Sequence, residues 1–228
     1  MKMLVHEWLS VFLVFSLTSQ APKSGSNLDV LNRSVVLRDL RGTSVDAVAA
    51  LLAQTEIPGE VVSIYSDCKQ PSEKVFSSPA GATLRQALDY VSTADSARSW
   101  TYRNGVIVFG PSPAPKTILD TTLGEVTVKL GDTLSLSTQS LLQSKEVQAG
   151  IKRTGLAELN TPLGLSAVRR VEAPHVAPAH SAESVQLRGK TLEQALNFLA
   201  SAKRNAAWHY EQFGCGQKTT FRVSWLIQ

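Results

Sequence analysis

The sequence contains few residues of the types that build reactive centres. Among its 228 residues there are 2 cysteines, 2 methionines and 4 histidines, and aromatic residues make up 7%. It also lacks the Gly-x-Ser-x-Gly motif of many hydrolases, a phosphate-binding glycine loop and the His-Glu-x-x-His motif of zinc proteases. We therefore predict no catalytic, cofactor-binding or metal-binding residues, and we expect a protein that is not an enzyme.

Long apolar runs and strong charge of one sign are also missing. The longest apolar segment, at 8–17, has about ten residues, whereas a helix needs ~20 to cross a bilayer. The net charge is +4, and the basic residues are dispersed rather than gathered into the stripe that nucleic-acid binding requires. A hydrophobic content of 43% argues against disorder. These features predict a globular chain with no nucleic-acid partner.

The first 21 residues have the order of a secretory signal. Lys2 lies in the charged start, the apolar segment WLSVFLVFSL follows, and small residues lead to Ala21. We predict that residues 1–21 are a signal peptide, that the mature chain has no transmembrane span, and that it is periplasmic or secreted. An uncleaved N-terminal anchor is the alternative.

An exported chain can form disulfides, because its compartment is oxidising. The two cysteines, Cys68 and Cys215, lie in different halves of the sequence and at non-equivalent positions. A bond between them would link the two halves across a very long loop. We regard this disulfide as possible; free or intermolecular cysteines are the alternatives.

The most informative feature is an internal repeat. The segment TLRQALDYV at 83–91 aligns without a gap with TLEQALNFL at 191–199, at an offset of 108 residues. The match begins upstream at Gly81 and Gly189 and extends to the aromatic residues Trp100/Trp208 and Tyr102/Tyr210. Solenoid repeats recur every ~20–50 residues, so this period indicates a duplicated small domain instead.

The repeat divides the chain into two domains, at 28–110 and 122–228, joined by a proline-rich linker at 111–121. Apolar periodicity, threonine caps and turn residues predict the elements of each copy. In the first copy these are strands at 34–40, 61–65 and 75–77, helices at 43–54 and from Thr83, and a hairpin at 100–109. In the second they are extra β structure at 122–137, a helix at 146–159, a strand at 165–171, a helix from Thr191 and a hairpin at 208–227.

This layout resembles the secretin and TonB N-terminal short domain. The resemblance rests on the capped helix T-L-x-Q-A-L-D-Y-V followed by W-x-Y and V-I-V-F. It covers most of 30–110; the second copy matches well over 185–228 and loosely over 122–184. It implies an α+β fold of two tandem small domains, each with two helices packed on small two- and three-stranded sheets. It also implies periplasmic docking; the sequence includes neither a secretin core nor a receptor barrel.

The resulting hypothesis is a non-enzymatic docking module of a bacterial secretion, pilus or TonB-type envelope system. It would bind a secretin, receptor or regulator by adding a strand to an exposed sheet edge. The candidate edges are 34–40 and the closing hairpin strands. A periplasmic binding protein for a small ligand or cell-wall glycan is the alternative, and an envelope hydrolase is supported only by the expected location.

The repeated aromatic residues and the histidines are the remaining candidates for a site. Trp100 and Tyr102 alternate at strand period, as do Trp208 and Tyr210, so each pair should face its preceding helix as core or, alternatively, as a ligand platform. His175 and His180 are five residues apart in a proline-rich loop, which is a poor spacing for metal binding. His209 should point to the opposite face from its neighbours, and we expect it to be exposed.

Overall fold

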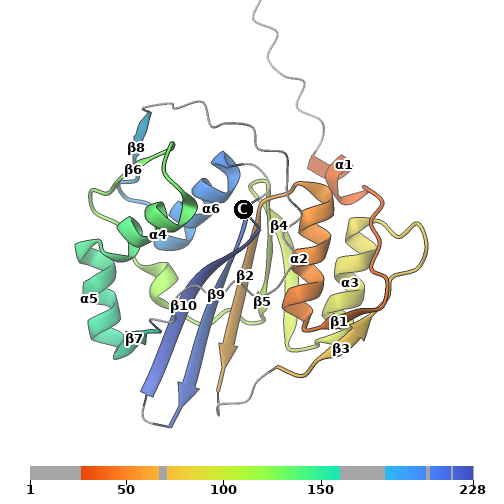
Figure 1. Ribbon diagram of the computed structural model, residues 1–228. Coiled ribbons are helices and arrows are strands. Elements are labelled where there is room, and N and C mark those ends of the chain that lie inside the picture. Colours follow the sequence, from red (N-terminus) through yellow and green to blue (C-terminus); the bar gives the residue numbers. More distant parts are fainter. Residues whose placement is uncertain (1–26, 67–70, 160–182, 204–205, 217, 228) are drawn as a thin grey trace, which may run out of the picture.

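The computed structural model describes residues 27–66, 71–159, 183–203, 206–216 and 218–227. Helices and strands are both abundant, which confirms the predicted α+β class. The elements fall into two modules that follow one another along the chain (Figure 1).

The first module contains three helices and five strands among its described residues. They are α1 (Asn27–Leu31), β1 (Leu40–Gly42), α2 (Ser44–Thr55), β2 (Gly59–Tyr65), β3 (Lys74–Phe76), α3 (Leu84–Ala94), β4 (Arg98–Arg103) and β5 (Val106–Pro111).

The second module repeats this pattern with an extra helix. Its described elements are the 3₁₀ helix η1 (Ile118–Asp120), β6 (Thr127–Lys129), α4 (Leu134–Leu142), α5 (Lys145–Thr154), β7 (Leu156–Glu158), β8 (Ser184–Gln186), α6 (Leu192–Ala202), β9 (Ala207–Cys215) and β10 (Lys218–Ile227).

Local sequence explains why the repeated helices begin where they do. Thr83 caps α3, and its side chain and that of Gln86 each bond to the backbone of the other residue, which forms a capping box. Thr191 and Gln194 repeat this arrangement at α6. The duplicated sequence thus encodes the same helix start twice.

The strand order shows that the duplication extends to the tertiary structure. Strands β4-β5-β2 and β9-β10-β7 have the same order, each with an antiparallel hairpin and a third strand parallel to the closing strand. Each module also has a two-stranded antiparallel sheet, β1-β3 or β6-β8. An isolated bridge joins Ser34 to Thr83 and recurs between Thr122 and Thr191.

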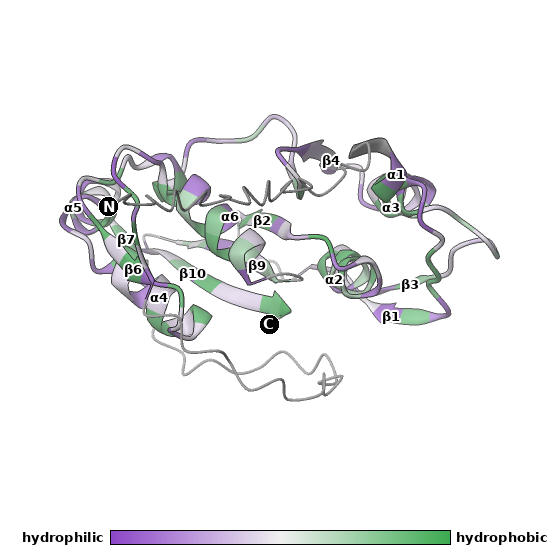
Figure 2. Cartoon of the chain, turned by 90° about the horizontal axis from the view of Figure 1, so that it is seen from above, coloured by the Kyte–Doolittle hydropathy of each residue, from purple (hydrophilic) through white to green (hydrophobic). Residues whose placement is uncertain are grey.

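The two three-stranded sheets are fused into one sheet of six strands. Strand β2 of the first module pairs in parallel with β9 of the second, which gives the order β4-β5-β2-β9-β10-β7. Seen from above, α2 and α3 lie toward one end of the molecule and α4 and α5 toward the other (Figure 2). The predicted linker at 111–121 includes η1, whose Ile118 and Leu119 are buried in the second core.

The two cores lie on opposite faces of this sheet. Val61 and Phe109 pack with the residues of α2 and α3, whereas Val62 packs against the core that contains Trp208 and Leu196 of α6. Successive residues of β2 point to opposite faces, so the helices of the two modules cover opposite sides. Each core also takes residues from the other module, which ties the modules together energetically.

Several predicted elements differ from the structure. Segment 34–40 is not a strand: β1 begins at Leu40, and Ser34 makes only an isolated bridge. Segment 122–137 is not purely β, because Thr133 caps helix α4 after the short β6. Helix α5 ends at Thr154, since Gly155 adopts the left-handed conformation that terminates helices. The strand predicted at 165–171 lies outside the described residues.

Candidate functional site

Strand β4 ends the six-stranded sheet, and its outer edge is open among the described residues. Its inner side pairs with β5 along the whole strand. The hairpin turns at Asn104 and Gly105, both of which have positive φ, as a two-residue turn of this kind requires. In such a hairpin the flanking pair is hydrogen-bonded, and alternation then directs the backbone groups of Trp100 and Tyr102 toward the open edge.

The equivalent edge in the second module is filled. Strand β9 is the counterpart of β4, and its outer side carries β2 through seven parallel pairs, from Gly59 opposite Ala207 to Tyr65 opposite Phe213. The same strand position is therefore open in one module and occupied in the other. The predicted edges need correction accordingly: the closing strands β5 and β10 lie inside the sheet, and its two end strands are the opening strand β4 and the short β7.

The repeated aromatic residues face their helices in both modules, but to different depths. Trp208 and Tyr210 are 0% exposed, whereas Trp100 and Tyr102 are half-buried. Trp208 Nε1 donates to Asn197 Oδ1 of α6 at 2.9 Å, and Trp100 Nε1 donates to Asp89 Oδ1 of α3 at 2.8 Å. Trp208 and Tyr210 are therefore core residues of the second module. The pair in the first is less covered because no strand lies beside β4 among the described residues.

A buried carboxyl group lies at the filled edge. Glu60 of β2 is 3% exposed, and its Oε2 accepts a hydrogen bond from Asn197 Nδ2 at 2.6 Å. Burial and the nearby Glu193 raise the pKa of Glu60 to about 7, against the opposing effects of Asn197 and Arg103. The Nη2 of Arg103 lies 3.8 Å from Glu60 Oε2 and also pairs with Glu193. The joint between the modules is therefore polar on this face.

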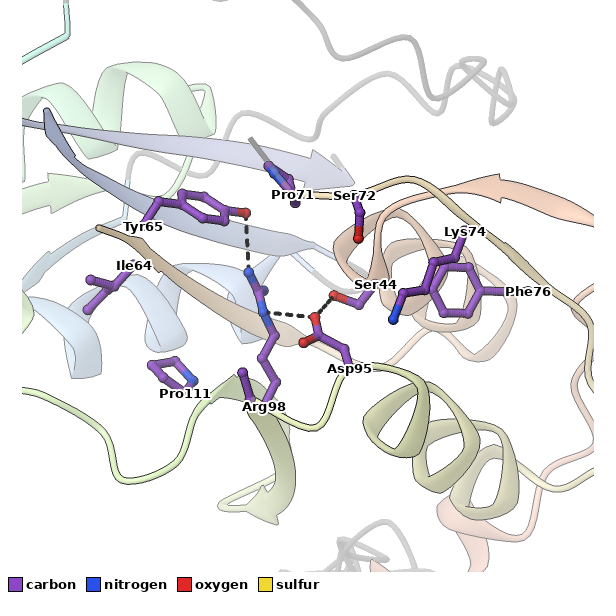
Figure 3. Close-up of a pocket in the computed structure, with 11 residues that line it drawn as sticks. Ser44, Ile64, Tyr65, Pro71, Ser72, Lys74, Phe76, Asp95, Arg98 and Pro111 are labelled. Atoms are coloured by element: carbon purple, nitrogen blue, oxygen red, sulfur yellow. Dashed lines mark hydrogen bonds and ion pairs between the residues drawn. The ribbon is translucent and has the colours of Figure 1, made fainter. Parts of the chain in front are cut away.

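On the other face, Arg98 organises a second polar network (Figure 3). Its guanidinium donates to Ser63 Oγ at 2.9 Å and to the Tyr65 hydroxyl at 3.2 Å, and it pairs with Asp95 at 3.2 Å. Asp95 in turn accepts a hydrogen bond from Ser44 at the start of α2, at 2.5 Å. The network connects α2, the α3–β4 turn and β2, and so holds the N-terminal end of β4 in place.

The histidine predicted to be exposed, His209, is buried instead and belongs to this network. It is 5% exposed, and its Nε2 lies 2.7 Å from Ser63 Oγ. Burial, with Arg98 and Arg222 nearby, lowers the pKa of His209 to about 3, so the imidazole is neutral at ordinary pH. The expectation failed because the pairing of β2 with β9 places Ser63, and the Arg98 that Ser63 binds, beside this side chain.

Ser63, His209 and Glu211 stand in the order that serine hydrolases use. His209 Nδ1 is 3.9 Å from Glu211 Oε1, and Glu211 also pairs with Arg222. However, Ser63 is 0% exposed and sits in the middle of a sheet, where no substrate can reach it. A histidine with a pKa near 3 is also a weak base at neutral pH. The arrangement therefore gives no support to the hydrolase hypothesis.

A pocket of about 250 Å³ opens beside Arg98. Ser44, Tyr65 and Lys74 are among its lining residues (Figure 3). Its charged groups already have partners, since Arg98 pairs with Asp95 and Lys74 Nζ donates to a backbone carbonyl. Stacking on Phe213, at 5.1 Å between ring centroids, also engages Tyr65. The pocket therefore gives little support to the small-ligand and glycan alternative.

Lowering the pH should destabilise the network through His209. Below pH 6.5 the His209 side chain takes up a proton in the unfolded chain but not in the folded chain. Protonation therefore favours the unfolded state, and the free energy of unfolding declines as the pH falls from 6.5 toward 3. Between pH 7 and 4 the loss should be about 3 kcal/mol. Urea unfolding of the native chain and of His209→Gln at several pH values measures this loss. The difference between their free energies of unfolding should shrink as the pH falls from 7 to 4. Parallel curves would contradict the shift.

The other sequence candidates lie at or beyond the limits of the described residues. His175, His180 and Cys68 are outside them, whereas Cys215 ends β9. The described residues include no free cysteine. The pairing of Cys68 with Cys215 stays a prediction, and it agrees with the register, because Tyr65 lies opposite Phe213 as both strands approach the cysteines.

Comparison of the chain with known protein families, curated proteins and solved structures gave no match. No helix among the described residues is long and apolar enough to span a bilayer.

Proposed function

We propose that this protein is a non-enzymatic docking module of a bacterial cell envelope, and that it binds a partner protein by strand addition at β4. The observation that carries the proposal is that the equivalent edge of the second module, on β9, is already paired with a strand. In the second module, β9 accepts a seven-residue parallel strand at the same position. Open strand edges provide backbone hydrogen bonds to extended segments of partners, so β4 has the form of an acceptor.

The location in the envelope is proposed on two further grounds. One is the signal-like order of residues 1–21, and the other is the resemblance to the secretin and TonB N-terminal short domain. Both are properties of the sequence, and an experiment in the producing cells tests what they predict.

Site-specific photo-crosslinking in the producing cells tests the proposal. A photoreactive residue replaces Thr101, which is exposed on β4, and a control replaces Thr127, which is exposed on β6 at a rival edge. Fractionation should place the protein outside the cytoplasm, and Thr101 should form an adduct with one extended segment of an envelope protein. Adducts from Thr127 but not Thr101 would remove β4 as the docking edge, and a cytoplasmic location would remove the envelope role.

A further inference from the structure

The two acceptor edges differ at the helix positions that a docked strand meets. In the filled site, Glu60 of β2 lies opposite Trp208 and contacts Asn197 of α6, with Glu193 one turn earlier. The offset of 108 residues places Asp89 where Asn197 is and Arg85 where Glu193 is. Both replacements lie on α3, beside the open edge, and both are exposed.

The exchange of asparagine for aspartate inverts the hydrogen bonding of the site. Asn197 accepts from the Trp208 indole through Oδ1, and its Nδ2 donates to the incoming Glu60. Asp89 accepts from the Trp100 indole through Oδ1 in the same way. Its second oxygen, Oδ2, can only accept, whereas Asn197 has a donating NH₂ group at that position. A glutamate in the docked strand would therefore place its carboxylate against that of Asp89. The docked strand needs a hydrogen-bond donor at this position instead.

The neighbouring cation adds the opposite requirement. The Arg85 guanidinium lies over the Trp100 ring, 5.7 Å from its centroid, and has only donors. A lysine in the docked strand would satisfy Asp89 and be repelled by Arg85, and a glutamate would do the reverse. A carboxamide satisfies both, because its NH₂ group donates to Asp89 and its oxygen accepts from Arg85.

We infer that the partner strand carries glutamine or asparagine opposite Trp100. This inference rests on the proposed docking at β4 and specifies its partner. The strand runs parallel to β4, as β2 does to β9, and an apolar residue follows two positions later, opposite Tyr102, where Val62 lies opposite Tyr210 in the filled site. The partner is a protein with an exposed extended segment of the form Gln/Asn-x-apolar.

Peptides based on the chain's own β2 test this specificity. The probe is a fluorescent peptide of residues 57–66 with Glu60→Gln, and the comparison peptides keep Glu60 or carry Glu60→Lys. Binding to the full chain is followed by anisotropy, and a photoreactive residue at Thr101 confirms that the peptide occupies β4. The glutamine peptide should bind about tenfold more tightly than either charged peptide.

A charge-neutralising variant provides the rescue. Asp89→Asn converts the open site toward its filled twin and should improve binding of the glutamate peptide about tenfold, whereas the control Asp29→Asn, an exposed aspartate on α1, should change nothing. Equal binding of all three peptides at Thr101 would overturn the specificity and leave strand addition standing. If no peptide reaches Thr101, or if Thr101 crosslinks to a second copy of this chain instead, the inference is overturned.

Discussion

Replacing Trp208 with alanine should lower the free energy of unfolding by about 3–5 kcal/mol, as expected for removal of a buried tryptophan. The side chain is 0% exposed and belongs to the second core, and its indole is hydrogen-bonded to Asn197. The substitution leaves a large cavity and removes the donor to Asn197 Oδ1, whereas Asn197 Nδ2 keeps its hydrogen bond to Glu60. Urea denaturation followed by circular dichroism measures the change, and Trp208→Phe, which retains most of the packing, provides a value if the alanine variant does not fold.

The repeat supplies the matched control. Trp100→Ala removes the equivalent residue and the equivalent hydrogen bond to the preceding helix, but from a half-buried position. It should cost about half as much or less, because less apolar surface leaves the core. Equal costs in the two modules would show that Trp100 is as fully packed as Trp208, and would contradict an uncovered β4 edge.

Loss of the predicted disulfide should have an effect of similar size. Cys215→Ser should lower the free energy of unfolding by up to about 5 kcal/mol, because a bond between Cys68 and Cys215 would close a very long loop and restrict the unfolded chain. Mass mapping of peptides from the unreduced protein should find the two cysteines linked. Denaturation with and without a reductant should give the same difference as the substitution.

The two single substitutions distinguish a disulfide from two separate contributions. Cys68→Ser and Cys215→Ser should be equally destabilising, and the double variant should cost no more than either. Two thiols that react with an alkylating reagent in the unfolded, unreduced protein would rule out the bond. In that case any cost of Cys215→Ser would come from local packing at the end of β9.

Local chemistry made much of the fold predictable. Helices α3 and α6 begin at the expected threonines because a capping box involves only residues three apart. The hairpin at Asn104-Gly105 formed as expected, because those two residues favour positive φ. The aromatic pairs face their helices because strand alternation determines which residues share a face. All these features depend on interactions between near neighbours.

Predictions failed where distant residues decide the outcome. Strand alternation predicts correctly that His209 lies on the face opposite Trp208. Its burial, however, depends on β2, whose Ser63 contacts His209 although the two residues are 146 positions apart in the sequence. The sequence predicts the closing hairpin strands as edges, because nothing local reveals that β2 pairs with β5 and that β7 pairs with β10. The segment after Thr133 alternates like a strand and so predicts β structure, whereas its packing in the second core favours helix α4.

The sequence by itself determined that two related modules exist, where their repeated helices start and where the first hairpin turns. These properties depend on interactions between residues close in the sequence, and the duplication repeats them in both modules. Only the tertiary structure decided how the modules join. A strand offers hydrogen bonds on both edges, and the sequence does not say which edge will be paired. Pairing of β2 with β9 buries Trp208, Glu60 and His209 and leaves the equivalent edge of β4 open, so the candidate site is a consequence of that choice.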